Sequence, residues 1–283
     1  MDLEKVAIMR LRDGAEISKR YYDKPLMLCY SGGKDSDLIL DLAIKSGIDF
    51  EVQHSHTTAD APETVYHIRD KFKELESKGI KCNIDMPRYK GKPTSMWSLI
   101  VQKTRLVRYC CAILKETGGK NRAIATGVRR AESTKRRSKG VIETYNSNPS
   151  NRIVLNNDND DKRQIVEHCH LQGKIIFNPI CDWSDSDVRE YINQEHINLN
   201  PLYSCGFDRV GCIGCPMASK KRFAEFARYP KYRNMYIRAF DKMLEVRKQR
   251  GKTTQHANGL EVYHWWMQDG VLPGQLSFDG EDW

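Results

Sequence analysis

Short apolar runs and helix-like periodicity alternate along the first two-thirds of the chain. The run LMLCY at 26–30 is uninterrupted and typical of a buried strand, and the apolar spacing at 38–47 predicts a helix that ends at a glycine cap. A second strand pattern at 48–55 is followed by a helix pattern at 61–79, with proline near its start and glycine at its end. Strands separated by helices predict a mostly parallel sheet.

The alternation continues with further segments of the same two kinds. DWSDSDVREYINQEH at 182–196 predicts a helix, and its Ser184 and Asp187 match a capping box. The whole pattern predicts an α/β fold, Rossmann-like, with helices on both faces of a mostly parallel sheet. Three short apolar segments are additional strand candidates: 80–86, 122–127 and 174–180.

The pattern changes after residue 217. Between 220 and 251, large apolar side chains recur at helix-like intervals among many lysines and arginines. We therefore predict two domains, an α/β domain at 1–217 and a basic, aromatic-rich helical C-terminal extension at 218–283. Packing on a core is the default interpretation of the aromatic side chains, while the basic side chains suit contact with nucleic acid.

Composition limits the class of protein. The 283 residues are 40% hydrophobic and 29% charged, which allows a sizeable core, and no apolar stretch is long enough to cross a membrane. The first residues, MDLEKVAIMRLRDG, lack the layout of a signal peptide. We expect a soluble cytoplasmic protein without membrane contact. The net charge of +9 favours anionic partners such as nucleotides, sulfonucleotides or nucleic acids.

The stretch SGGKDS at 31–36 lies where the first predicted strand turns into a helix. Ligands of open parallel sheets bind beyond the carboxyl ends of the strands, and here two glycines, a lysine and a helix N-terminus meet. These features predict a phosphate-binding loop, with an ordinary glycine-containing turn as the alternative. The loop is not a Walker A motif, because Asp35 replaces its Ser or Thr and Leu28 replaces its first glycine.

SGGKDS resembles the signature of PP-loop ATP pyrophosphatases, which bind ATP and in most members cleave it between the α and β phosphates. Five further segments are similar, in the same order, to the phosphoadenosine phosphosulfate (PAPS) reductase-like branch of that superfamily. Together the matches cover most of residues 26–217. The five segments are HTTADAPET (56–64), RYCCAILKE (108–116), TGVRRAES (126–133), NPICDWSDSDVREYI (178–192) and NPLYSCGFDRVGCIGCP (200–216).

The resemblance implies a nucleotide site built from several of these segments. Arg129 and Arg130 follow a predicted strand, where guanidinium groups can clamp phosphate or sulfate, whereas the basic run at 135–139 fits a solvated loop equally well. Asp35 is expected to assist a Mg²⁺ ion that offsets the phosphate charge. The expected catalytic residues are Lys34, Asp35, Arg129 and Arg130. The expected ATP contacts are Ser31, Gly32, Gly33, Lys34, Asp35, Ser36, Thr57 and Gly127.

The cysteines indicate metal or redox chemistry, because the chain has nine of them and no secretion signal. Cys110 and Cys111 are adjacent, while Cys212 and Cys215 form a C-x-x-C flanked by glycines. Four thiolates from two segments can hold a [4Fe-4S] cluster, whereas zinc sites more often pair cysteines across two to four residues. Zinc ligands and unliganded core cysteines are the alternatives. The pairing resembles that of adenosine phosphosulfate (APS) reductases, which carry a [4Fe-4S] cluster beside the nucleotide.

The other cysteines receive simpler interpretations. Cys169 lies between two histidines in a polar stretch, where a solvated side chain is favoured over a metal ligand. Cys205 is close in sequence to the expected cluster ligands and is either a bystander or a carrier of sulfane sulfur. Three cysteines in or beside predicted strands are interpreted as small buried hydrophobic side chains: Cys29, Cys82 and Cys181.

Two reactions are known for the enzymes that the chain resembles. Sulfonucleotide reductases attack sulfate with a cysteine in a C-terminal ECGxH motif, and no cysteine follows Cys215 here. DNA phosphorothioation proteins of the DndC and SspD kind instead insert sulfur with a cysteine desulfurase as donor. On that analogy we predict an ATP-driven sulfur transferase acting on nucleic acid, with DNA as the first expectation. An APS/PAPS reductase that forms sulfite and a non-catalytic nucleotide-binding module are the alternatives, and a homo-oligomer is left open.

Overall fold

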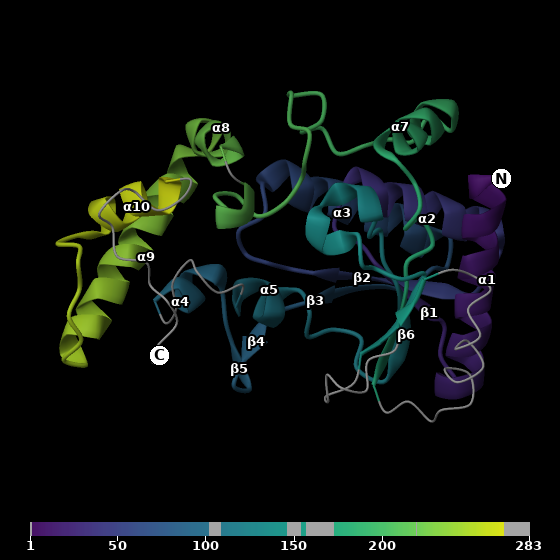
Figure 1. Cartoon of the computed structure of the whole chain (residues 1–283), viewed down its shortest axis with the longest axis horizontal. Helices are drawn as coiled ribbons and strands as arrows, with labels where there is room; N and C mark the ends of the chain where they lie inside the picture. The colour runs from purple at the N-terminus through teal and green to yellow at the C-terminus, as the bar shows by residue number, and fades with distance from the viewer. Residues whose placement is uncertain (1, 102–108, 146–153, 157–172, 219, 269–283) are drawn as a thin grey trace. The chain divides into compact units, whose positions relative to one another are not determined.

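The computed structural model describes residues 2–101, 109–145, 154–156, 173–218 and 220–268 (Figure 1). Its contacts divide the chain into two compact units, each built from segments that are distant in the sequence. The first unit comprises Met1–Ser55, Pro62–Asp85 and Gly118–Val210. The second unit comprises His56–Ala61, Met86–Thr117 and Gly211–Trp283.

A seven-stranded sheet forms the centre of the first unit. Its parallel strands are β1 (Leu26–Cys29), β2 (Phe50–Ser55), β3 (Cys82–Asp85), β6 (Arg122–Ala125) and β9 (Lys174–Phe177). Two further strands, β7 (Ile142–Tyr145) and β8 (Val154–Leu155), extend it by antiparallel pairing. The order is β3-β2-β1-β6-β9-β7-β8, so β1 lies between β2 and β6. The strands that follow β1 in the sequence, β2 and β3, lie on one side of it, while the later strands β6 and β9 lie on the other side. The order in which strands are added to the sheet therefore reverses between β1 and β6.

Helices pack on this sheet. α1 contacts β1, β6 and β9, and it also contacts α2, while α3 contacts β3. The mostly parallel α/β fold with helices was predicted from the sequence and is confirmed. Among the described residues of the first unit, the helical elements are α1 (Leu3–Tyr22), α2 (Lys34–Ser46), α3 (Pro62–Ser77), α7 (Asp185–Gln194) and the short turns η1 (Arg130–Glu132) and η2 (Thr134–Arg136).

Local sequence signals explain where the helices of this unit begin and end. α2 ends at Gly47, which adopts φ +68°, the left-handed conformation that glycine accepts without strain. At the start of α7 the predicted capping box is present, since Asp187 N–H donates to Ser184 Oγ at 3.2 Å and Ser184 N–H donates to Asp187 Oδ2 at 2.7 Å.

The long N-terminal helix α1 was not predicted, although its signal is present. Ala7, Leu11, Gly14 and Ile17 are buried at the three- and four-residue spacing of one helix face. A Cβ atom added at Gly14 would lie 3.2 Å from the ring of Phe177, so a glycine lets α1 approach β9 closely. This segment was used only to argue against a signal peptide, and its helical period was overlooked.

The second unit is built mainly from helices. Tyr236 and Phe240 of α9 contact Trp266 of α10, with ring centroids 5.7 and 5.3 Å apart, and all three side chains are buried. The helical C-terminal segment was predicted, with its aromatic side chains packed on a core. The elements are the hairpin strands β4 (Arg88–Tyr89) and β5 (Lys92–Pro93), and the helices α4 (Met96–Ile100), α5 (Tyr109–Leu114), η4 (Pro216–Ala218), α8 (Lys221–Arg228), α9 (Pro230–Gln249) and α10 (Gly259–Met267).

The two compact units do not coincide with the division proposed at residue 217. The second unit adds His56–Ala61 and Met86–Thr117 to the C-terminal helices, and its last segment begins at Gly211. All four predicted cluster cysteines therefore belong to the unit of the C-terminal helices. The domain boundary at 217 stays a prediction. In the described part of the chain, no helix combines the length and the apolar character that crossing a bilayer requires.

Candidate nucleotide loop and cysteine site

The SGGKDS loop connects β1 to α2 in the first unit, and its first glycine is required by geometry. Gly32 adopts φ +71°, and an added Cβ atom would lie 2.9 Å from Ile68 Cγ1. A side chain at this position would therefore suffer both backbone strain and a steric clash. Gly33 follows in an extended conformation and is the N-cap residue of α2.

Backbone N–H groups converge at the start of α2. Gly33 N–H donates to Ser36 Oγ at 3.1 Å, and Lys34 N–H donates to the hydroxyl of Tyr203 at 2.9 Å. The first turn of a helix carries unpaired N–H groups and the positive end of the helix dipole. Ser36 Oγ and the Tyr203 hydroxyl thus accept hydrogen bonds from N–H groups that can instead bind phosphate oxygens at a helix N-terminus.

A buried asparagine supports the loop from a distant segment. Asn200 has no exposed surface, and its Nδ2 donates to Gly32 O and to Thr64 Oγ1, both at 3.1 Å. Its Oδ1 accepts the N–H of Leu202 at 3.0 Å. Asn200 and Tyr203 therefore connect the loop to the segment that follows α7. Sequence reasoning included NPLY in a matching segment but assigned neither residue a role.

The Lys34 side chain lies at the loop, and its charge helps to lower the pKa of the Asp185 carboxyl after the larger effect of Arg129. Its Nζ is 3.5 Å from Asp208 O, the outer limit of a hydrogen bond, and 5.9 Å from the centre of the Tyr203 ring. Burial raises the pKa of that tyrosine to about 12, so it stays a neutral hydroxyl at physiological pH. The ammonium charge is consequently well placed to pair with an added phosphate.

The loop after β6 approaches the same place. β1 and β6 are neighbours at the point where the strand order reverses, which is where open α/β sheets bind ligands. A Cβ atom added at Gly127 would lie 3.0 Å from Asp35 O, so glycine permits close approach of the two loops. The structure thus brings Gly127 to the loop, as the predicted site requires, although nucleotide contact itself stays a prediction.

The Arg129 guanidinium is paired with two carboxylates of the protein. It is buried, with 1% of its side chain exposed, and its Nε donates to Asp35 Oδ1 at 2.7 Å. Its second terminal nitrogen donates to Asp185 Oδ1 at 2.8 Å. Burial raises the pKa of Asp35, and the Arg129 charge opposes this rise. Its charge thus holds the loop carboxylate, and the expected catalytic role of Arg129 stays a prediction.

Arg130 is also engaged by protein groups. Its guanidinium forms an ion pair with Asp182 and donates through Nε to Lys139 O at 2.8 Å. The side chain remains 30% exposed, which leaves part of it accessible to solvent. In the adjacent basic run, Lys139 pairs with Glu143 at 3.0 Å. A catalytic role for Arg130 stays a prediction.

A buried polar group lies at the back of the loop. Asp37, in the first turn of α2, accepts a hydrogen bond from the Tyr30 hydroxyl and lies 3.2 Å from His67 Nε2 of α3. Burial strongly raises the pKa of Tyr30, and the neighbouring Asp37 carboxylate adds to the effect. These contacts fix the first turn of α2 to α3. They were not anticipated, because only contacts far apart in the sequence bring the three residues together.

The second unit brings both cysteine pairs together. The pKa of the Cys110 thiol is raised, first by a hydrogen bond with Cys111 and by burial, and further by Cys215 and Cys212. Neighbouring thiolates repel one another and so raise each other's pKa, unless a cation offsets their charge. The structure therefore agrees with the expected grouping of the four cysteines. Whether they bind metal stays a prediction.

The spacing of the sulfur atoms bears on which metal group would fit. In a tetrahedral zinc site, with Zn–S bonds of about 2.3 Å, all four sulfur atoms would be about 3.8 Å apart. In a four-iron cluster each thiolate binds a different iron atom, which separates them more widely. Four cysteine thiols are the usual donor set of a [4Fe-4S] cluster.

A lysine adds positive charge to this group. The pKa of Lys115, one residue after α5, is raised, first by Cys212 and then by Asp60, Cys111 and Cys215. An ammonium near thiolates stabilises their ionised form. Sequence reasoning missed Lys115, and its only local signal is its position four residues after Cys111.

Helices α8, α9 and α10 hold the C-x-x-C loop in place. Gly214 adopts φ +69°, and an added Cβ atom would lie 2.2 Å from Phe226 Cζ of α8. Trp266 Nε1 of α10 donates to Gly214 O, and the Tyr236 hydroxyl of α9 donates to Ile213 O, both at 2.8 Å. Each of the three helices therefore contributes at least one contact that sets the loop conformation.

The matching segment HTTADAPET also reaches this loop. Ile213 N–H donates to Ala59 O at 2.8 Å, and Asp60 pairs with Cys212 in an isolated bridge. Thr57 is buried in the same segment, and its N–H donates to Asp60 Oδ2 at 3.1 Å. Thr57 thus belongs to the second unit, and its expected contact with nucleotide stays a prediction.

The remaining cysteines differ in accessibility. Cys181 is fully buried, as predicted, whereas Cys29 and Cys82 are only partly buried. Burial raises the pKa of both Cys29 and Cys82 to about 11, which keeps them as neutral thiols. Cys205 is exposed. Cys169 lies outside the described residues.

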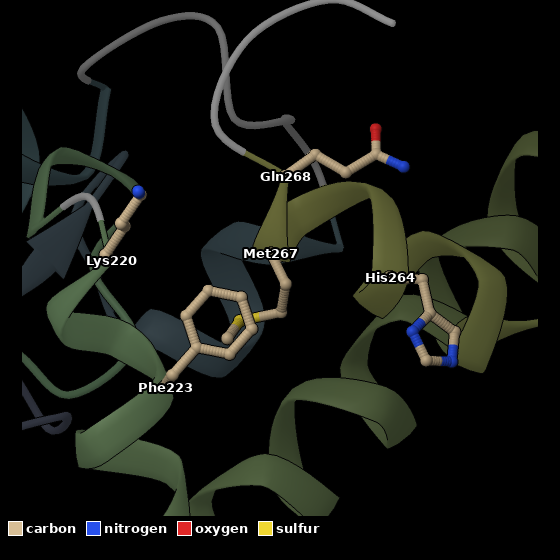
Figure 2. A pocket seen from close by; sticks show the side chains of 5 residues that line it. All are labelled: Lys220, Phe223, His264, Met267 and Gln268. Atoms are coloured by element: carbon tan, nitrogen blue, oxygen red, sulfur yellow. The ribbon is translucent and has the colours of Figure 1, made fainter.

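An open hollow occurs elsewhere in the second unit (Figure 2). Its volume is about 710 Å³, and Phe223 on its wall is 56% exposed. None of the predicted site residues lines it. The lining residues are Lys220, Phe223, His264, Met267 and Gln268.

The fold and the loop define a class of protein: an α/β protein with a glycine-containing strand-to-helix loop at the reversal point of a mostly parallel sheet. The sequence matches the family model described as the phosphoadenosine phosphosulfate reductase domain over residues 25–218. This match covers more than half of the chain, and the protein belongs to that family.

Individual relatives agree with this assignment. An uncharacterized protein of Methanocaldococcus jannaschii is 29% identical over 251 residues, or 83% of this chain and 52% of its own length. The adenosine 5'-phosphosulfate reductase of Streptomyces coelicolor is 32% identical over 111 residues, or 38% of this chain and 37% of that protein. The chain therefore spans about half, or less, of the length of these curated relatives.

Among solved structures, the phosphoadenylyl-sulfate (PAPS) reductase of Candida auris, in a phosphate complex, is similar. The alignment covers 72% of this chain and 93% of that protein, with 18% sequence identity and a TM-score of 0.43.

Proposed function

We propose that this protein is an ATP-dependent sulfur-transfer enzyme, which activates an acceptor by adenylylation and releases pyrophosphate. The observation that carries the proposal is the complete SGGKDS loop at the β1/β6 reversal point. Gly32 there adopts the required left-handed conformation, and the Lys34 ammonium lies beside the loop, 3.5 Å from Asp208 O. A polyphosphate is the ligand that such a loop suits.

The loop residues would act by binding and orienting the nucleotide. The N–H groups of Gly33 and Lys34 would exchange their side-chain partners for phosphate oxygens, and the Lys34 ammonium would offset the negative charge. Asp35 accepts from Arg129 through Oδ1, and a magnesium ion carried by ATP would bind its other oxygen. Arg129 is a positioning residue in this scheme.

The reaction balances without an external oxidant. An acceptor oxygen attacks the α-phosphorus of ATP, the bond to the bridging oxygen of the β-phosphate breaks, and pyrophosphate leaves with that electron pair. The terminal sulfur of a persulfide then attacks the activated acceptor phosphorus, and AMP leaves with the former acceptor oxygen. A second thiol then cleaves the S–S bond as a two-electron reductant, so that sulfur stays on phosphorus and the two thiols end as a disulfide. We propose a cysteine desulfurase as the source of sulfur, by analogy with the related phosphorothioation systems.

We propose a nucleic-acid backbone phosphate as the acceptor, with DNA as the first candidate. The net charge of +9 supports an anionic macromolecule as partner. A phosphodiester group also supplies the oxygen that adenylylation needs and the phosphorus to which sulfur is transferred.

The second unit would hold a [4Fe-4S] cluster through Cys110, Cys111, Cys212 and Cys215. The donor set is four thiols that influence one another's ionisation, and four cysteines are the usual ligands of such a cluster. When bound, such a cluster supplies iron–sulfur chemistry and offsets the charge of the four thiolates. Lys115 contributes further positive charge at this place.

Pyrophosphate release tests the proposal. Protein purified anaerobically and loaded with iron is incubated with ATP, with and without DNA and a cysteine desulfurase. We expect release that DNA stimulates, followed by sulfur in the recovered DNA. If neither DNA nor RNA supports release in the presence of a desulfurase, ATP-driven transfer to nucleic acid is refuted.

A sulfonucleotide reductase is the second candidate. The family itself and the 32% identity to the APS reductase of S. coelicolor support it. This enzyme would form sulfite from APS or PAPS with a thiol reductant and without ATP, so a sulfite assay separates the two reactions. A non-catalytic nucleotide-binding module would bind ATP and give neither product.

A further inference from the structure

The positive charge of the chain is concentrated in one segment. Residues 220–252 contain twelve Lys and Arg against three Asp and Glu, which is a net charge of +9. The whole chain has 46 basic and 37 acidic residues, so the rest of the chain carries 34 of each sign. The excess therefore belongs to α8, α9 and the residues that follow them, and not to the nucleotide loop.

Helix α9 presents part of this charge along one side. Lys231, Arg238 and Lys242 are exposed and follow one another at intervals of seven and four residues. These intervals place the three side chains on a single stripe of the helix. From Lys231 to Lys242 the stripe advances 11 residues and is therefore about 16 Å long, so its three cations can contact neighbouring phosphates of a nucleic-acid strand.

The opposite side of α9 is committed to the core. Tyr236, Phe240 and Met243 are buried there. The charged stripe is thus not needed for packing. Lys242 pairs with Glu245 at 2.8 Å, and both side chains are 59% exposed, so a phosphate can compete for this lysine at little cost. We call Lys231, Arg238 and Lys242 the α9 basic stripe.

The composition of the stripe favours nucleic acid over a lipid surface. A helix that lies on a membrane inserts a row of large apolar side chains beside its basic ones. On this side of α9, Met235 is the apolar side chain recorded as exposed, and it is 39% exposed. Phosphate contacts alone require only a row of cations, which the stripe supplies.

We propose that the α9 basic stripe is a binding surface for the phosphodiester backbone of a nucleic acid. The surface lies on the unit that also carries the cysteines. This surface would bring the acceptor strand to the enzyme, and in this role it rests on the proposed function. Because the contacts are to phosphates, binding depends on salt and hardly on base sequence.

The test compares two charge-reversal variants of the full-length protein. Lys231→Glu, Arg238→Glu and Lys242→Glu are combined in one variant. The control combines Lys5→Glu, Lys73→Glu and Lys81→Glu, which are 84%, 79% and 71% exposed in the first unit. Both variants change the net charge equally, and circular dichroism confirms that both are folded.

Affinity is measured without ATP by fluorescence anisotropy, with duplex DNA, single-stranded DNA and single-stranded RNA of one sequence, at several salt concentrations. We expect the stripe variant to bind its preferred form at least about tenfold more weakly than the control variant, and the salt slope to fall in magnitude by about two to three. Preference for any of the three forms supports the proposal and identifies the form.

Two results would overturn the proposal. Equal loss of binding in both variants would show that net charge alone attracts nucleic acid. Binding to phosphatidylserine vesicles that depends on the stripe, with no such dependence for nucleic acid, would assign the surface to lipid. The binding assay contains no ATP and is therefore independent of the pyrophosphate assay. Stripe-dependent binding without pyrophosphate release would refute the proposed chemistry alone. Pyrophosphate release without stripe-dependent binding would refute the proposed surface alone.

Discussion

Asn200 joins three backbone and side-chain groups that no local interaction could connect. It is buried between the carbonyl of Gly32, the hydroxyl of Thr64 and the N–H of Leu202. Without its amide, the Gly32 carbonyl and the Leu202 N–H would each lose a hydrogen-bond partner in the interior.

We predict that Asn200→Ala lowers the free energy of unfolding by about 2–3 kcal/mol, because buried polar groups are left unsatisfied. ATP affinity should fall as well, since Gly32 loses its support. Urea denaturation and a nucleotide-binding titration measure the two effects. Asn234→Ala, on the exposed side of α9, is the control and should change neither. Unaltered stability of the Asn200 variant would contradict this account of the loop.

The thiols offer a second residue-scale prediction, which depends on pH. Burial raises the pKa of Cys29 to about 11, so its thiolate fraction near pH 8 is about a thousandth and increases roughly tenfold for each pH unit up to that value. We expect iodoacetamide to modify exposed Cys205 first and Cys29 and Cys181 last, as followed by mass spectrometry.

The same shift has a consequence for stability. A thiol whose pKa is raised on folding favours the folded state while it is protonated, so that contribution is complete below pH 9 and decreases as the pH rises toward 11. Rapid alkylation of Cys29 in the native protein near pH 8 would contradict the raised pKa of its thiol.

At the scale of elements, the C-x-x-C loop depends on the helices that surround it. α8 leaves no space for a side chain at Gly214, while α9 and α10 bind the carbonyls of Ile213 and Gly214. The C-terminal helices thus do more than extend the α/β fold, because they shape the segment that carries two of the four cysteines.

We predict that Gly214→Ala removes most of the bound iron from anaerobically reconstituted protein, since its Cβ atom would lie 2.2 Å from Phe226. Gly206→Ala is the matched control, because Gly206 also has a positive φ, +84°, but no atom lies within 4 Å of the added Cβ. The control should suffer the backbone strain and keep its iron. Equal iron content in both variants would remove the loop from the metal site.

At the scale of the whole molecule, the nucleotide loop and the cysteines belong to different compact units. Lys34 lies in the first unit, and all four cysteines lie in the second. Residues of each site are therefore supported by separate packing cores.

We predict that the two sites can be inactivated independently. Lys34→Ala should weaken ATP binding by roughly 10- to 100-fold through the loss of one charged contact and leave the iron content unchanged. Cys212→Ser should lose the brown iron–sulfur chromophore and keep ATP binding. Calorimetry measures the ATP affinity, and iron analysis measures the iron content, of each of the two variants. Loss of iron in the Lys34 variant would show that the units are energetically coupled.

Much of the fold could be predicted because its signals are local. Five apolar runs became the parallel strands of the sheet, and the caps at Gly47 and Ser184 were identified correctly. The phosphate loop was recognisable because glycine conformation and helix dipoles act over a few residues. The helical period of α1 was equally local and was overlooked.

The remaining features depend on contacts between distant segments. Arg129 was expected to face an acceptor, and only tertiary packing paired it with Asp35 and Asp185, 94 and 56 residues away in the sequence. Nothing near Asn200 or Lys115 indicates which loop or which thiols they approach. By itself, the sequence determined the strands, the turns, the family and the residue types of the sites, because backbone conformation and hydrophobic period are set locally. Only the tertiary structure decided which charges neutralise one another, which polar groups support the loop and which helices enclose the cysteines, since these follow from long-range packing.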